Sequence, residues 1–219
     1  MLAHEQEFNL SQLTQSQRLD EMEFYLPLGN GNQMLTPAKI NALIDGKKLS
    51  FDALNGYLKG FIDLIFIHNG RYYVADYKSN HLGYEAADYS HEQLALSMAD
   101  HDYDLQAWIY TLALDRLLQQ RLADYDPEKH LGGVFYFYLR GMIDEFHDAE
   151  LPVMQSPLSH QPLDLFTDDA DDFSNQQAAF DTTQKSGVFY QAVDLQQLQR
   201  WRDCFFAFES SDSNNGGCL

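Results

Sequence analysis

The stretch GFIDLIFIHNGRYYVADYKSN, residues 60–80, contains two apolar runs separated by the dipeptide Asn69-Gly70. An Asn-Gly pair favours positive φ at both central positions of a two-residue turn, which is the geometry of a tight β-hairpin. The stretch therefore predicts two antiparallel strands, over residues 58–68 and 71–78.

Three charged residues interrupt these apolar runs: Asp63, Asp76 and Lys78. Residues an even number apart in a strand share a face, so Asp76 and Lys78 project from one side, and the turn folds the Asp63 strand against theirs. Two carboxylates at short range in a half-buried site are costly unless a cation neutralises them. Hard oxygen ligands suit Mg²⁺ or Mn²⁺. The pattern predicts a metal site, although an Asp-x-Lys pair taken alone more often forms a structural salt bridge.

The ammonium group of Lys78 indicates what such a site would do. Beside a metal, it can orient or help to deprotonate a water, or stabilise charge on a phosphoryl oxygen. The arrangement suits metal-assisted hydrolysis of a phosphodiester. A two-carboxylate glycosidase is excluded, because Lys78 has no role in that chemistry. A module that keeps the fold for docking or regulation is the alternative.

The composition favours one folded domain. The chain has 219 residues, of which 45% are hydrophobic, and no apolar run is long enough to cross a membrane. The first ten residues lack the features of a signal peptide, and two cysteines without a disulfide framework fit a reducing cytoplasm. The net charge of −19 argues against a stand-alone nucleic-acid binder. Residues 141–184 hold ten acids and no Lys or Arg, which is typical of a solvated loop or of a docking surface for a basic partner.

The remaining patterns predict an α/β sandwich around a mixed central sheet. A single domain is expected over residues 1–209, with an acidic loop or insertion over 144–186 and a frayed tail over 210–219. The other expected elements are a strand over 21–28, a short helix over 36–46, a helical region over 88–122 that breaks near 100–102, a strand over 132–141 and a helix over 194–208.

Three segments resemble one family along most of their length: KGFIDLIF…GRYYVADYKSN, YDLQAWIYTLAL and GGVFYFYLRG. They are similar to the nuclease domain at the C-terminal end of RecB subunits of RecBCD, bacterial exodeoxyribonuclease V. The resemblance runs from about Leu10 to Gly141. It implies a PD-(D/E)xK, restriction-endonuclease-like fold and a Mg²⁺-dependent DNA exonuclease, with Mn²⁺ as a substitute. It also implies DNA and the other subunits of a RecBCD-type repair and recombination complex as partners.

The resemblance assigns roles to individual residues. It implies that Asp63, Asp76 and the backbone carbonyl of Tyr77 bind the metal, that Lys78 is the catalytic lysine, that Glu21 is an active-site acid, and that Gln106 and Tyr110 form a Q-x-x-x-Y motif. Spaced by four, the last two share a helix face, yet without the resemblance they read as ordinary helix residues. Glu23 follows Glu21 by two and is either a solvated acid or one that supports the site.

The chain departs from the family at one position. The family has a further metal ligand, a histidine in a G-x-x-x-H helix upstream of the strand at 21–28, and His4 lacks that glycine spacing. His68 and His81 are expected at the surface. No Walker A motif of a helicase occurs either. The resemblance therefore implies a fragment or truncated relative of a larger subunit, with weak metal binding and slow or absent cleavage.

Overall fold

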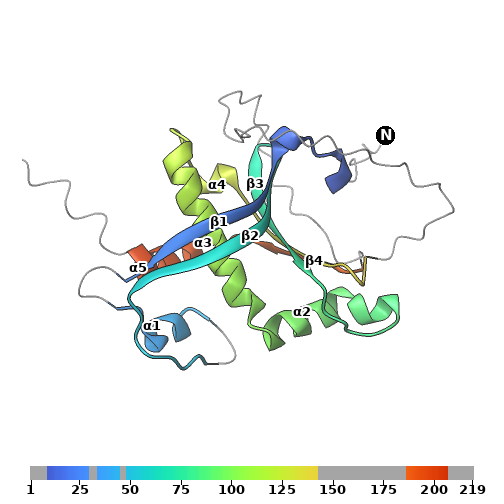
Figure 1. Cartoon of the computed structure of the whole chain (residues 1–219), viewed down its shortest axis with the longest axis horizontal. Helices are drawn as coiled ribbons and strands as arrows, with labels where there is room; N and C mark the ends of the chain where they lie inside the picture. Colours follow the sequence, from blue (N-terminus) through green and yellow to red (C-terminus); the bar gives the residue numbers. More distant parts are fainter. Residues whose placement is uncertain (1–8, 30–33, 45–47, 143–185, 207–219) are drawn as a thin grey trace, which may run out of the picture.

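The computed structural model describes residues 9–29, 34–44, 48–142 and 186–206. Its centre is a sheet of five strands in the order β1-β2-β3-β4-β5 (Figure 1). Strands β3 and β4 are parallel and the other neighbours are antiparallel, which confirms the predicted mixed sheet. The strands are β1 (Arg18–Leu28), β2 (Gly56–His68), β3 (Arg71–Lys78), β4 (Leu131–Tyr138) and β5 (Val188–Ala192).

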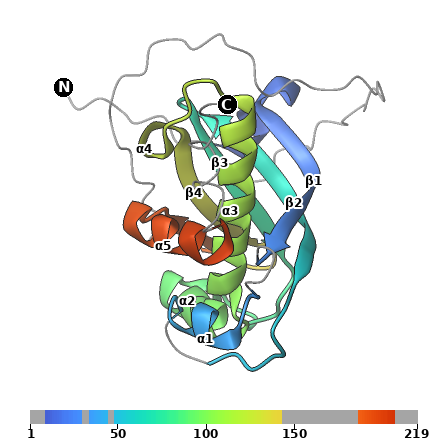
Figure 2. The same cartoon turned by 90° about the vertical axis from the view of Figure 1, so that its left-hand side faces the viewer.

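The main helices cover one face of this sheet. Helix α3 runs along the sheet, with α5 lying across it and α2 near its lower end (Figure 2). Because β3 and β4 are parallel, the chain needs a long crossover between them, and α2, α3 and α4 supply it. The helices are α1 (Pro37–Asn41), α2 (His91–Asp100), α3 (Tyr103–Arg121), α4 (Pro127–His130) and α5 (Leu195–Phe206). None of the described helices is both long and apolar enough to cross a bilayer.

Three local predictions with clear chemistry are confirmed. Asn69 and Gly70 have φ values of 49° and 71°, and β2 pairs antiparallel with β3 on either side of them. The helical region breaks at Asp102, whose φ of 55° lies in the left-handed region and separates α2 from α3. Asp194 caps α5, because its Oδ1 accepts from the backbone N–H groups of Gln196 and Gln197 at 2.8 and 3.0 Å.

Several element boundaries differ from prediction, and one strand was not predicted. Strand β1 begins at Arg18 rather than 21, because pairing with β2 continues as far as Phe66. Helix α2 begins at His91 rather than 88, since Asp88 instead accepts from the Glu85 N–H in a short 3₁₀ turn. Helix α1 ends at Asn41, and β4 ends at Tyr138. Strand β5 was missed. The predicted acidic loop, the tail, His4 and the last residues of the C-terminal helix lie outside the described residues.

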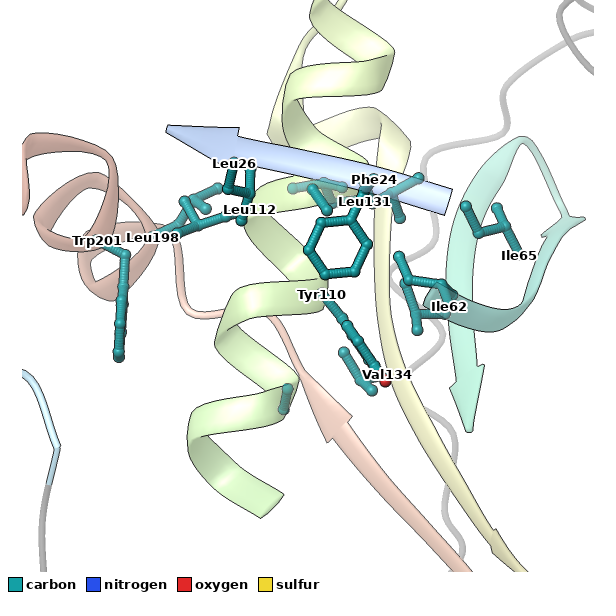
Figure 3. Packing of buried hydrophobic residues seen from close by; sticks show 14 of the residues in the cluster. Phe24, Leu26, Ile62, Ile65, Tyr110, Leu112, Leu131, Val134, Leu198 and Trp201 are labelled. Carbon is teal, nitrogen blue, oxygen red and sulfur yellow. The ribbon is translucent and has the colours of Figure 1, made fainter. Parts of the chain in front are cut away.

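The core lies between the sheet and the helices. Tyr110 from α3 contacts Phe24 from β1 edge-to-face, with ring centroids 5.9 Å apart, next to Ile62 of β2 (Figure 3). Trp201 and Leu198 of α5 extend the same cluster. A smaller aromatic cluster covers the other sheet face, formed by Leu64, Phe66, Tyr73, Ala75, Phe135 and Phe137. Asp76 and Lys78 of β3 point to the helix-covered face of the sheet, the same face as Val74 of the larger cluster.

Candidate active site

Strands β2 and β3 separate at the two acidic residues. Their ladder ends at the pair Leu64↔Ala75, so the next positions in register are Asp63 and Asp76. Beyond this point the Tyr77 N–H donates to Asp63 Oδ2 at 2.9 Å. The Asp63 carboxylate thus takes the place of the backbone acceptor that the ladder loses, and it is held beside the strand that carries Asp76.

The regular alternation of side chains also stops at Asp63. Ile62 and Ile65 pack into the same core cluster although they are three residues apart, while Leu64 packs into the other. In β1, Glu21 stands in register with Asp63 and has a φ of 54°. A side chain in this left-handed region strains the backbone and interrupts the pleat. These irregularities coincide with the position of Asp63, whose carboxylate is turned towards β3, where it accepts from the Tyr77 N–H.

Four side chains form a closed ring of polar contacts across β3 and α3. Tyr110 donates its hydroxyl to Asp76 Oδ1 at 3.3 Å, and Gln106 Nε2 donates to the Tyr110 hydroxyl at 2.8 Å. Lys78 Nζ donates to Gln106 Oε1 at 2.8 Å and lies 2.7 Å from Asp76 Oδ2. The Q-x-x-x-Y pair of α3 is therefore tied directly to the Asp-x-Lys pair of β3.

The ring is buried, and burial sets its electrostatics. Asp76 is 4% exposed and Lys78 8%. Burial raises the pKa of the Asp76 carboxyl above its usual range; the charge of Asp63 raises it further, while Lys78 and Tyr110 oppose the rise. Burial, together with the charges of both aspartates, also raises the pKa of Tyr110, so that its hydroxyl stays a neutral donor. A positive charge bound at Asp76 would offset the unfavourable burial of its ionised carboxylate.

Comparison with known proteins identifies the family. The model of the PD-(D/E)XK nuclease superfamily matches residues 5–218. The chain belongs to the PD-(D/E)XK nuclease superfamily. It is 45% identical over 150 residues to the RecBCD enzyme subunit RecB of Escherichia coli (strain K12), which covers 65% of this chain and 12% of that protein.

Other RecB subunits match in the same way. The RecB of Haemophilus influenzae is 41% identical over 147 residues, covering 66% of this chain and 12% of the relative. The RecB of Mycobacterium tuberculosis (strain H37Rv) is 37% identical over 156 residues, covering 61% and 14%. The chain thus spans about an eighth of the length of these relatives. The resemblance found in the sequence is confirmed.

A PD-(D/E)XK nuclease of this kind implies a divalent cation, and the residues present fit one. Asp76 Oδ2 is buried and lies 2.7 Å from the Lys78 ammonium, without a well-aligned hydrogen bond from the described residues. Asp63 supplies a second carboxylate beside it. Oxygen donors of this type suit Mg²⁺ or Mn²⁺. No cluster of three or more His, Cys, Asp or Glu suited to a metal occurs within the described ranges.

The other acids and histidines named from the sequence lie outside the ring. Glu21 is exposed and stands in register with Asp63, outside the ring. Glu23 forms an ion pair with Lys59 and accepts from the Tyr25 hydroxyl at 2.5 Å, on the exposed side of the β1–β2 ribbon. His81 is exposed as predicted, whereas His68 is half-buried. The metal-binding role of the Tyr77 carbonyl stays a prediction.

Sequence reasoning missed the aromatic residues around Lys78. Lys78 Nζ lies 3.7 Å from the ring centroid of Tyr103 and 5.2 Å from that of Tyr136. The sequence did contain one indication that Tyr103 lies near the site. Tyr103 precedes Gln106 by three residues and therefore lies on the same helix face. Tyr136 stands beside Asp76 in the parallel β3–β4 ladder, which only the sheet order reveals.

Proposed function

We propose that this chain is a nuclease domain that hydrolyses DNA phosphodiester bonds with Mg²⁺, as part of a RecBCD-type helicase-nuclease acting in double-strand break repair and recombination. The observation that carries the proposal is the ring of Asp76, Lys78, Gln106 and Tyr110, with Asp63 fixed beside it by Tyr77. A structural salt bridge would need only the first two residues.

The proposed role of each residue in the site follows from its contacts. Asp63 and Asp76 would hold the cation, which when bound polarises the scissile phosphate and lowers the pKa of an attacking water. Lys78 lies against Asp76 Oδ2, so its ammonium can stabilise negative charge on a phosphoryl oxygen brought to that carboxylate. Gln106 fixes the direction of the Lys78 ammonium, and Tyr110 fixes the Asp76 carboxylate.

The test is a nuclease assay on end-labelled linear DNA and on closed circular DNA, with Mg²⁺ or Mn²⁺. The parent should degrade the linear substrate, although slowly because two protein carboxylates hold the cation weakly, and should spare the circle, as an exonuclease does. Lys78→Met and Asp76→Asn should lose this activity, while Lys129→Met, at a surface lysine with 65% side-chain exposure, should retain it. Equal degradation by Lys78→Met and by the parent would refute the assignment.

One observation favours a second candidate, a catalytically weak module used for docking or regulation. The candidate site brings together two carboxylates, and the described residues add no third His, Cys, Asp or Glu to them. A cation held by two protein carboxylates keeps more of its waters and is bound less firmly. The same assay separates the candidates, because a docking module leaves linear DNA intact with both metals at all protein concentrations tested.

A further inference from the structure

Lys78 is held by more than the polar ring. Its Nζ lies 3.7 Å from the centre of the Tyr103 ring, closer than the usual limit of about 6 Å for a cation–π contact. The Tyr136 ring lies 5.2 Å away. Asp76 and Gln106 contact the ammonium group on two sides, and the two aromatic rings enclose it on another side.

The break between α2 and α3 sets the place of Tyr103. Asp102 adopts the left-handed conformation, and Tyr103 is the first residue of α3. The backbone N–H groups of Leu105 and Gln106 then donate to the Asp102 carbonyl at 3.2 and 3.3 Å, which starts the helix. The same break therefore positions both side chains that contact Lys78 from α3, one turn apart.

The Tyr103 ring is itself immobilised on several sides. Its hydroxyl donates to Asn80 Oδ1 at 3.2 Å, in the loop that follows β3. The ring stacks on His101 with centroids 5.2 Å apart and on Tyr136 with centroids 5.9 Å apart. Tyr136 also donates its hydroxyl to the Tyr103 carbonyl at 3.0 Å. Three near-parallel rings thus form a rigid wall.

We propose that Tyr103 is a positioning residue for Lys78, which through the face of its ring keeps the ammonium group between Asp76 and Gln106. Lysine has a long flexible stem, and a point charge on such a stem samples many rotamers unless contacts restrict it. The ring attracts the ammonium and also fills the space into which the stem would otherwise turn. The effect on cleavage rests on the proposed function, whereas the effect on the position of Lys78 does not.

A direct measurement of position uses the magnetic shielding of the Tyr103 ring. The chain has seven lysines, so protein labelled with ¹³C at lysine Cε gives a simple NMR spectrum. The Lys78 methylene protons, assigned by their loss in Lys78→Met, should be shifted upfield. Tyr103→Phe, which keeps the ring, should retain the shift, and Tyr103→Leu should abolish it. An unchanged Lys78 resonance in Tyr103→Leu would overturn the proposal. Tyr103→Met replaces Tyr103→Leu if the latter does not fold.

Kinetics provide the second readout. Tyr103→Leu should lower kcat by about tenfold with KM unchanged, and Tyr103→Phe should stay within about twofold of the parent. Phe205→Leu, at a buried aromatic residue of α5, is the matched control for lost packing and should keep the parent kcat. A Tyr103→Leu enzyme as active as Phe205→Leu would contradict the positioning role. A parent that cleaves no DNA would refute the proposed function, while the NMR experiment would still decide the position of Lys78.

Discussion

Lys78 Nζ donates to Gln106 Oε1 at 2.8 Å, and this contact is one of two hydrogen bonds that join strand β3 to helix α3 within the ring of the candidate site. The two residues are 28 positions apart in the chain, because Gln106 belongs to the crossover that connects β3 to β4. Since Gln106 also donates to Tyr110, its amide has one orientation that satisfies both neighbours.

Loss of this amide should impair catalysis more than stability. In Gln106→Leu, Lys78 loses its acceptor and Tyr110 loses a donor, so we expect kcat to fall by about tenfold or more. Gln120→Leu makes the same substitution at an exposed position of α3 and should leave cleavage unchanged. Thermal unfolding of both variants, recorded beside the nuclease assay, separates the two effects. Equal kcat values for the two variants would show that the ring does not matter for chemistry.

Metal affinity should respond in opposite ways at Lys78 and Asp76. The Lys78 ammonium lies 2.7 Å from Asp76 Oδ2 and competes with a cation for that oxygen. Lys78→Met should therefore bind Mn²⁺ at least as tightly as the parent, although it does not cleave DNA. Asp76→Asn should bind it much more weakly, because a carboxylate ligand is lost. Isothermal titration measures both, and weaker binding by Lys78→Met would argue against a cation at Asp76.

A buried ion pair should dominate the stability of the helical layer. Asp115 of α3 is fully buried, and its Oδ2 accepts from Arg202 Nε of α5 at 2.9 Å. Arg202→Met leaves that carboxylate without its cation, at an expected loss of about 3 kcal/mol in the free energy of unfolding. Lys129→Met, which breaks an exposed pair with Asp126, is the control. Urea unfolding that gives the two variants the same midpoint would contradict this expectation.

The pH dependence of stability should carry a contribution from His68. Burial lowers the pKa of His68 below its ordinary value of 6.5. His68 is therefore protonated at a higher pH in the unfolded chain than in the folded chain. As a result, the free energy of unfolding decreases as the pH falls from about 6.5 through the folded pKa of His68. His68→Gln should flatten this part of the stability profile, which urea unfolding at a series of pH values measures. Matching profiles for His68→Gln and the parent would refute the assignment.

Local turn chemistry explains what the sequence alone could predict. The Asn69-Gly70 turn and the interruption near Asp102 depend on the conformations of a few adjacent residues. Both were predicted correctly from the sequence. The pairing of Asp63 with the strand of Asp76 followed from the hairpin. The positive φ of Glu21 could not be foreseen, because a glutamate gives no indication of the left-handed region.

Contacts that depend on the packing of distant elements were not predictable in the same way. Strand β5 has the β-forming run Val188, Phe189 and Tyr190, but the acidic segment before it concealed the signal. The Tyr103 ring contacts Lys78 because the beginning of α3 packs against β3 beside that lysine, and the sequence does not indicate this packing. Only the resemblance suggested a role for Gln106 and Tyr110, and the structure provides the contacts that tie them to Asp76 and Lys78.

If Asp63 and Asp76 together hold the proposed cation, anomalous diffraction from crystals grown with Mn²⁺ should reveal it. We expect one strong anomalous peak between the two carboxylates, which disappears in Asp76→Asn crystals of the same form. A peak of equal height in Asp76→Asn, or Mn²⁺ bound only elsewhere on the parent, would contradict it.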